Sequence, residues 1–176
     1  MQRTVTFPTG VTAEQKGTVL SVKGPKGALE RDFVFDHVNW TLDGDKLTIA
    51  STSDRKKIGA GIGTLAAHVQ NMITGVTVGF EASLKVVYAH FPIKVTVQGT
   101  KVVVSNFLGE RSDRITEAAE GVKVEVKKDD VFVSGPDKDK VGQTAGRIEG
   151  VARVTGFDKR VFMDGIHLVQ KAHPRK

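Results

Sequence analysis

The chain contains an internal repeat, and this repeat most limits the folds available to it. GTVLSVKGPKGALER (17–31) and GTKVVVSNFLGER (99–111) share a Gly-Thr opening, a β-branched run, a glycine turn and a Glu-Arg exit. Further along, KLTIASTSDRKKIGAGIGTLAAHV (46–69) has a counterpart in DVFVSGPDKDKVGQTAGRIEGV (130–151). Two copies separated by roughly 80 residues predict two homologous units and not a solenoid, which needs more repeats.

Local patterns predict similar elements in both copies. Runs of β-branched residues predict strands at 19–22, 47–49, 102–104, 122–126 and 131–133. The GPKG stretch (24–27) is typical of a hairpin turn, because glycine allows a positive φ and proline presets the next one.

Helical periodicity follows the second strand run in each copy. Apolar residues from Ile58 to Ile73 recur on one helical face, with Ser53 or Asp54 as the expected N-cap and Gly75 as the expected end. In the second copy, the matching face is Val141, Ala145, Ile148 and Val151. The sequence therefore predicts an α+β fold of two tandem homologous units, each a small antiparallel sheet packed by one helix. We place the first unit at 1–82 and the second, which ends in a basic tail, at 83–176.

Gly59, Gly61 and Gly63 raise the question of a phosphate-binding loop. A dinucleotide-binding loop needs G-x-G-x-x-G, but Thr64 occupies the position of the third glycine. No Gly-Lys-Ser/Thr follows the Walker spacing either. We expect the glycines to allow close packing of helix against sheet, with close approach to a nucleic-acid backbone as the alternative. The second copy keeps Gly142 and Gly146, so both units would share this need.

The residue types needed for catalysis or metal binding lack the required spacing. The chain has no cysteine, and its five histidines form neither H-x-x-x-H nor H-E-x-x-H. There is no G-x-S-x-G motif, and the carboxylates fall mostly in predicted turns. A Ser-His-Asp arrangement depends on geometry and is not excluded by spacing. The patterns nevertheless favour a protein that is not an enzyme, without metal, cofactor or small-molecule substrate.

The sequence also lacks the features of a membrane or secreted protein. No apolar stretch approaches the roughly 18 residues of a membrane span. The N-terminus has no apolar signal region, and the absence of cysteine fits a reducing compartment. We expect a cytoplasmic protein.

Positive charge is concentrated in the last part of the chain. The 26 Lys and Arg against 20 Asp and Glu give a net charge of +6. Residues 138–176 hold nine basic and four acidic residues, so this segment contributes +5, while residues 1–85 hold ten and eight. This asymmetry predicts a polyanionic partner at the C-terminal end.

Two kinds of basic segment are candidates for phosphate contact. Lys56 and Lys57 lie in the first turn of the first predicted helix, and Lys138 and Lys140 in that of the second. Cations there oppose the helix dipole, and a bound phosphate would reverse this penalty. The alternative is that these lysines are solvated surface residues. The basic tail within 156–176 is expected to become ordered along a phosphate backbone, with a frayed terminus as the alternative.

Five segments carry a resemblance to a known family: VKGPKGALERDF (22–33), VYAHFPIKV (87–95), NFLGER (106–111), VGQTAGRI (141–148) and FMDGIHL (162–168). They resemble the archaeal and eukaryotic branch of the large-subunit ribosomal protein six family, in its order and spacing over almost the whole chain. The resemblance implies two tandem sheet-plus-helix units and no enzyme activity. It also implies binding to large-subunit rRNA near the sarcin–ricin loop and the factor-binding region, mainly through the second unit and the tail, beside neighbouring ribosomal proteins.

The residues that the resemblance and the charge pattern assign to rRNA binding are Lys138, Lys140, Arg147, Lys159, Arg160, Gly165, Lys171, His173, Arg175 and Lys176. Lys56 and Lys57 are assigned as secondary RNA contacts. The alternative from another class is a protein-interaction module that binds a partner by pairing along a sheet edge. A nucleotide-dependent enzyme comes third. RNA binding should weaken steeply with salt, whereas edge pairing should not.

Overall fold

A computed structural model describes residues 2–34, 37–51, 55–158 and 160–175 of the chain. It contains two compact units, Met1–Gly79 and Phe80–Lys176. The sequence predicts a boundary between residues 82 and 83. In the structure the boundary comes earlier, between Gly79 and Phe80, because the whole of strand β7 (Phe80–Val87) belongs to the second unit. Each unit is described below by itself.

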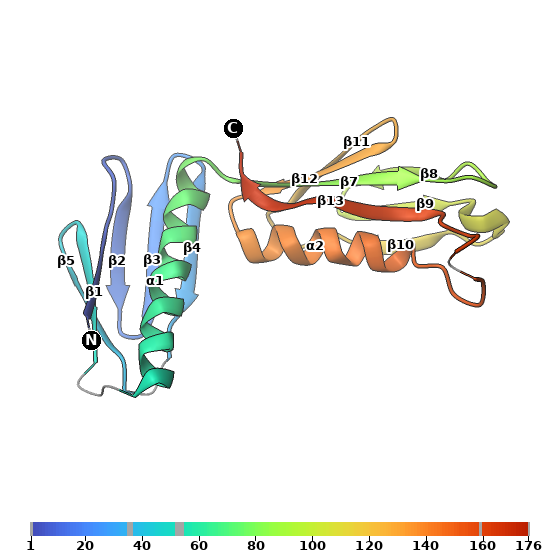
Figure 1. Ribbon diagram of the computed structural model, residues 1–176. Helices are drawn as coiled ribbons and strands as arrows, with labels where there is room; N and C mark the ends of the chain where they lie inside the picture. The colour runs from blue at the N-terminus through green and yellow to red at the C-terminus, as the bar shows by residue number, and fades with distance from the viewer. Residues whose placement is uncertain (1, 35–36, 52–54, 159, 176) are drawn as a thin grey trace. The chain divides into compact units, whose positions relative to one another are not determined.

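The first unit consists of six strands followed by one long helix. Its elements are β1 (Gln2–Thr6), β2 (Thr12–Lys16), β3 (Val19–Gly24), β4 (Gly27–Asp32), β5 (Asn39–Asp43), β6 (Lys46–Ala50) and α1 (Lys56–Thr77). The strands form two three-stranded antiparallel sheets, in the orders β1-β6-β5 and β2-β3-β4. Helix α1 contacts both sheets and runs along β3 and β4 (Figure 1).

The second unit repeats this plan and adds one strand. Its elements are β7, β8 (Lys94–Gln98), β9 (Lys101–Ser105), the 3₁₀ helix η1 (Phe107–Gly109), β10 (Arg114–Glu117), β11 (Lys123–Lys127), β12 (Asp130–Gly135), α2 (Lys138–Val151) and β13 (Gly165–Pro174). The orders β7-β12-β11 and β8-β9-β10 match β1-β6-β5 and β2-β3-β4 of the first unit. The α+β class and the tandem repeat are therefore confirmed. Strand β13 is the addition, and it pairs with β7.

A separate apolar core holds each unit together. In the first unit, Leu65 and Val69 of α1 are fully buried in the same cluster as Leu20 and Ile49 of the sheets. In the second unit, the buried face of α2 joins the cluster of β7, β12 and η1, where Phe107 is fully buried. The predicted helical faces are confirmed: Ile62, Leu65, Val69 and Ile73 are buried on α1, and Val141, Ala145 and Ile148 on α2.

The predicted ends of α1 differ from the observed ones. Gly75 was expected to end the helix, and this prediction is wrong, because the helix continues to Thr77 with Gly75 and Val76 both buried. Burial of the Val76 side chain favours the extra turn, and Gly79, with φ of 80°, follows it. Arg55 occupies the N-cap position without a side-chain hydrogen bond, and the expected caps Ser53 and Asp54 lie outside the described residues.

In the first unit, close packing of helix against sheet occurs at the β3–β4 turn. A Cβ atom on Gly24 would lie 2.7 Å from Val76 Cγ2 and 2.9 Å from the Val76 carbonyl oxygen. The Lys26 N–H donates to that same carbonyl oxygen at 2.9 Å. The turn therefore docks on the last turn of α1, and only a residue without a side chain fits at position 24.

The equivalent connection in the second unit is longer than the sequence suggested. The run at 106–111 was compared with a tight glycine turn, but it forms η1 with left-handed backbone at Asn106 and Leu108. Strand β10 starts only at Arg114. The inserted turn buries Phe107, and this burial explains the longer path.

Arg114 joins this connection to the end of α2. Its guanidinium donates to the Glu110 carboxylate at 2.6 and 2.8 Å, and to the carbonyl oxygens of Val151 and Arg153 at 2.9 and 3.0 Å. It also lies 4.2 Å from the centroid of the Phe107 ring. The hydrogen bond to Glu110 raises the pKa of Arg114, and that bond in turn lowers the pKa of Glu110. Val151 is the last residue of α2, so a cation bound to its carbonyl oxygen also complements the helix dipole.

The Gly24→Ala variant should lower the free energy of unfolding of the first unit by about 1–3 kcal/mol, because the added methyl group overlaps Val76. The matched control is Gly63→Ala, where the nearest atom to the new Cβ is Arg3 Nη1 at 4.0 Å. Alanine at this helical site should raise stability by about 0.5–1 kcal/mol. Urea unfolding followed by Trp40 fluorescence measures the free energy of unfolding of both variants. Equal changes in the two variants would contradict the close approach of Gly24 to Val76.

The Arg114→Lys variant should lower the free energy of unfolding of the second unit by about 2 kcal/mol, because an ammonium cannot bridge Glu110 and two carbonyls at once. Arg111→Lys, at an exposed position nearby, serves as the control and should have little effect. Amide hydrogen exchange measured across α2 reports the stability of the second unit alone. Equal protection in the two variants would count against the bridging role.

Candidate nucleic-acid interface

The first turn of α2 carries two of the predicted RNA-binding lysines. The Asp137 carboxylate accepts a hydrogen bond from the Asp139 N–H at 2.9 Å and so caps the helix. Lys138 is half-buried, with Nζ 5.7 Å from the centroid of the Phe80 ring, and Lys140 is exposed. Two cations therefore stand at the positive end of the helix dipole, an arrangement that a bound anion would stabilise.

A hollow of about 400 Å³ lies between the first half of α2 and the end of β13. We call it the basic hollow, and its lining residues are Lys138, Asp139, Gly142, Gln143, Ala145, Leu168, Lys171 and Ala172. Lys138 comes from the helix and Lys171 from the strand, so the fold brings together two predicted contacts that are distant in the sequence. The single carboxylate in the lining, Asp139, only partly offsets their charge.

Three glycines, Gly142, Gly146 and Gly150, form an exposed glycine face on α2. A Cβ atom on any of them would meet nothing within 4 Å. The predicted packing of helix against sheet at Gly142 and Gly146 is therefore wrong, because these residues lie away from the buried face of α2. The glycine face instead leaves the helix backbone open to an approaching chain, which was the alternative expectation.

Other predicted cations are exposed at separate places. Lys140 and Arg147 are exposed, and their spacing of about two turns puts them on one flank of α2, distinct from the glycine face. Arg160 is exposed in the loop after α2, where its N–H donates to Asp158 Oδ1 at 3.0 Å. Lys159 lies outside the described residues. The structure thus groups Lys138 with Lys171 and leaves Lys140, Arg147 and Arg160 spread around the unit.

Asp164, in the DGI motif, holds two loops together. Its side chain is fully buried and accepts hydrogen bonds from the Ala89 N–H at 2.9 Å and the His90 N–H at 3.4 Å. The His90 Nδ1 lies 3.6 Å from Asp164 Oδ1, and the His90 ring stacks on Phe162 with centroids 4.7 Å apart. Burial raises the pKa of Asp164, but these hydrogen bonds outweigh it and keep the pKa below its usual value.

Gly165 is buried at the start of β13. A Cβ atom there would lie 3.2 Å from the Ala152 carbonyl oxygen and 3.2 Å from His167 Nε2. The glycine thus allows β13 to pass closely over the end of α2. Its assignment as an RNA contact stays a prediction.

The basic tail is part of a strand. Strand β13 pairs with β7 as far as Pro174 opposite Phe80, so the expectation that the tail becomes ordered only on contact is wrong for these residues. Pairing satisfies backbone groups that β7 would otherwise expose at a sheet edge. Within this strand Lys171 is exposed and His173 is half-buried. Arg175 Nε lies 3.4 Å from Glu81 Oε2, and Lys176 lies outside the described residues.

The secondary candidates belong to the first unit. Lys56 and Lys57 are both exposed in the first turn of α1, which contains no acidic residue. They form the same kind of cationic helix start as Lys138 and Lys140. Their contact with RNA stays a prediction.

Within the described part of the chain, no group of three or more His, Cys, Asp or Glu residues could hold a metal ion. The helices described here include none with both the length and the apolar character needed to cross a membrane.

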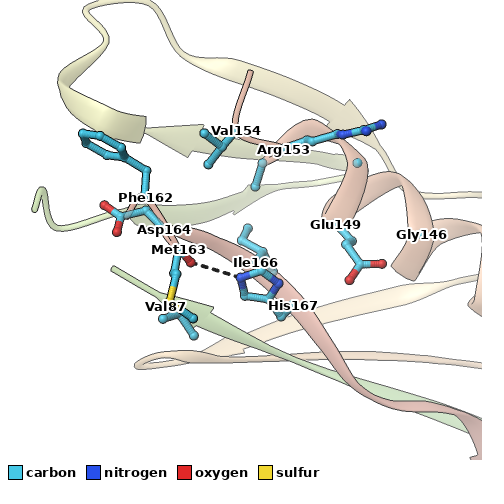
Figure 2. Close-up of a pocket in the computed structure, with 12 residues that line it drawn as sticks. Val87, Gly146, Glu149, Arg153, Val154, Phe162, Met163, Asp164, Ile166 and His167 are labelled. Carbon is cyan, nitrogen blue, oxygen red and sulfur yellow. Dashed lines mark hydrogen bonds between the residues drawn. The ribbon is translucent and has the colours of Figure 1, made fainter. Parts of the chain in front are cut away.

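Sequence reasoning missed a second hollow, of about 730 Å³, between the second half of α2 and the start of β13. We call it the apolar hollow, because most of its lining is apolar (Figure 2). Its lining residues are Val87, Gly146, Glu149, Gly150, Ala152, Arg153, Val154, Phe162, Met163, Asp164, Ile166 and His167. The apolar run Val161, Phe162, Met163 is a local signal that could have indicated it, and in the structure Val161 and Met163 are 60% and 64% exposed.

The Asp164→Asn variant should lower the free energy of unfolding at neutral pH by about 1–3 kcal/mol, because it removes the charge that two buried hydrogen bonds and His90 stabilise. The folded pKa lies below the unfolded value of about 3.9, so this stabilisation is present above about pH 4 and disappears as the pH falls through the folded pKa.

Thermal unfolding across a pH series measures this effect, with the exposed Asp113→Asn variant as the control. The curves of wild type and Asp164→Asn should converge at acidic pH. A gap that stays constant from neutral to acidic pH would contradict an ionised Asp164.

Comparison with known proteins agrees with the repeated fold. The family model described as Ribosomal protein L6 matches residues 7–79 and 91–165, one segment in each unit. Proteins named "Large ribosomal subunit protein uL6" are similar to the chain over nearly its whole length. The one from Methanothrix thermoacetophila is 47% identical and covers 96% of both chains. That from Methanospirillum hungatei is 43% identical over 98% of both, and that from Saccharolobus solfataricus is 39% identical over 97% of this chain and 95% of its own.

These matches cover both units at an identity well above the level at which family membership is in question. The chain belongs to the ribosomal protein L6 family, whose members are structural constituents of the large ribosomal subunit and not enzymes.

Proposed function

We propose that this chain binds large-subunit rRNA near the sarcin–ricin loop and the factor-binding region, mainly through its second unit. The observation that carries the proposal is the basic hollow, whose lining includes both Lys138 and Lys171 beside the N-terminus of α2. A phosphate placed there would interact with both cations and with the positive end of the helix dipole.

The surroundings of the basic hollow support contact with a nucleic-acid backbone. Gly142, which belongs to the glycine face, also lines this hollow, so a phosphate–sugar chain can approach the helix without meeting a side chain. Lys140, Arg147 and Arg160 are exposed in the same unit. Contacts of this kind position an RNA through charge and shape, and they need no particular base sequence.

The predicted rRNA-binding residues of the C-terminal strand differ in how readily they could contact a phosphate. Lys171 lines the basic hollow, whereas Arg175 pairs with Glu81 and would have to release it to reach a phosphate. The partners are large-subunit rRNA and neighbouring large-subunit ribosomal proteins, and the place of action is the cytoplasmic ribosome. We propose no cofactor, metal or small-molecule substrate.

Edge pairing with a protein partner is the other candidate. Strand β13 is one of the two outer strands of its sheet, with β11 at the other edge, and an added strand could pair with it. However, its register against β7 shifts twice, between Leu168 and Gln170 and between Gln170 and His173. Such irregularities make a strand a poor template for pairing, so we favour RNA binding.

Replacing both lysines of the basic hollow, in Lys138→Ala/Lys171→Ala, should weaken binding to large-subunit rRNA. It should also reduce the slope of log affinity against log salt by about one to two units, because roughly one counterion is released for each neutralised phosphate. Filter binding across a salt series gives both quantities. The control is Lys94→Ala/Lys101→Ala, which removes two exposed lysines from β8 and β9 of the same unit.

An unchanged slope in the Lys138→Ala/Lys171→Ala variant would reject the basic hollow as the phosphate site. Binding that is weak at every salt concentration in the wild type would reject RNA binding itself and favour a protein partner. Hydroxyl-radical footprinting on the bound rRNA tests the location, and protection away from the sarcin–ricin region would contradict that part of the proposal.

A further inference from the structure

On the side of α2, the apolar hollow is lined by two residues without side chains, with Glu149 beside them. Gly146 and Gly150 line the helix side, and a Cβ atom on either would meet nothing within 4 Å. In Figure 2, Phe162, Met163 and Val87 lie on the opposite side, with Ile166 and His167 along the strand between them. A flat group can therefore enter past the helix backbone and contact apolar surface within.

The loop side of the hollow is held in place by aromatic contacts. The Phe162 ring stacks on His90 and lies 4.8 Å, centroid to centroid, from the Phe157 ring. The buried Asp164 binds the same His90 through its N–H. This wall is thus formed before any ligand arrives, which lowers the entropic loss on binding.

The rim of the hollow offers one cation and two hydrogen-bond acceptors. Arg153 has no acidic partner among the described residues, and only its backbone oxygen is used, by Arg114. His167 Nε2 lies 3.2 Å from the Met163 carbonyl oxygen, which can only accept, so Nε2 donates and Nδ1 of the neutral ring remains an acceptor. Glu149 Oε1 accepts from the Leu168 N–H at 3.1 Å, leaving Oε2 as the second acceptor.

We propose that the apolar hollow receives one unstacked nucleobase of the bound RNA, with the adjoining phosphate at Arg153. A nucleobase has apolar faces that fit the walls and polar edges that suit Glu149 and His167. The volume of about 730 Å³ lies in the range typical of small-molecule sites, and proteins commonly recognise RNA through splayed-out bases. The inference rests on the proposed RNA binding and adds base recognition to it.

Charge favours a nucleotide over an apolar peptide as the occupant. Residues 138–176, which supply most of the lining, carry nine basic and four acidic residues. One of those acids, Asp164, is buried and already bonded to two N–H groups, so it does not face a ligand as a free charge. A second, Glu149, lines the hollow and offsets Arg153, so the attraction for a polyanion comes from the surrounding cations of the segment. A polyanion is thus drawn to this part of the unit, whereas an apolar segment gains nothing from Arg153.

The first test uses mononucleotides and the full chain. Methyl resonances of Met163 and Ile166 should shift when AMP, GMP, CMP or UMP is added, but not when ribose 5-phosphate is added, because only the nucleotides carry a base. Gly146→Leu should remove the shifts by filling the hollow. Ala67→Leu is the control, because it adds the same apolar side chain at an exposed position of α1 that lines neither hollow. Equal shifts with ribose 5-phosphate, or none with any nucleotide, would overturn the proposal.

The second test uses large-subunit rRNA. Gly146→Leu should weaken binding about tenfold, within the range measured for loss of one stacked base, and should leave the salt slope unchanged because no charge is removed. The variant keeps its fold, since position 146 is open and leucine favours helix over glycine. Ala67→Leu, exposed on α1, is the control for an added apolar side chain. Wild-type affinity in Gly146→Leu, with normal salt-dependent binding, would reject the base site and leave RNA binding intact.

The third test identifies the occupant directly. The chain is assembled into large ribosomal subunits with a photo-cross-linking residue at position 163. On irradiation, this residue should cross-link to RNA. Attachment to a protein would overturn the proposal and assign the apolar hollow to a neighbouring ribosomal protein.

Discussion

Burial of one apolar helix face against antiparallel strands is the interaction on which the rest of each unit depends. Once Val141, Ala145 and Ile148 lie against the sheet, the position of every other residue of α2 follows from helix geometry. The glycines are then left on the surface, Lys140 and Arg147 fall on one flank, and Lys138 meets β13. The surface available for binding is thus a consequence of the core.

Each unit has its own core of this kind, but the second unit carries an additional strand. Strand β13 has no counterpart among the described residues of the first unit, and the basic and apolar hollows are formed between α2 and β13 or the loop before it. Most of the net positive charge of the chain, +5 of +6, lies in residues 138–176, which contain the same stretch. The repeat therefore provides two similar scaffolds, and one extra strand gives the second unit its candidate binding surface.

Polar interactions in the second unit position loops more than they hold the core. Arg114 fixes the β9–β10 connection to the end of α2, and Asp164 joins the loop before β13 to the loop after β7. Each of these side chains satisfies several backbone groups at once, which is a typical way to order segments that lack regular hydrogen bonding. Both interactions hold segments beside the apolar hollow, so its shape depends on them.

The sequence by itself determined the repeat, the α+β class, the buried helical faces and the concentration of charge, because these follow from local periodicity and composition. Only the tertiary structure decided which glycines pack closely. Gly24 and Gly165 meet other backbone, whereas Gly142 and Gly146, which the pattern assigned to packing, face outward. It also decided that the tail pairs with β7, that Lys138 and Lys171 line one hollow and that an apolar hollow exists at all. These features depend on contacts between residues far apart in the chain, and local periodicity carries no information about which distant segments meet.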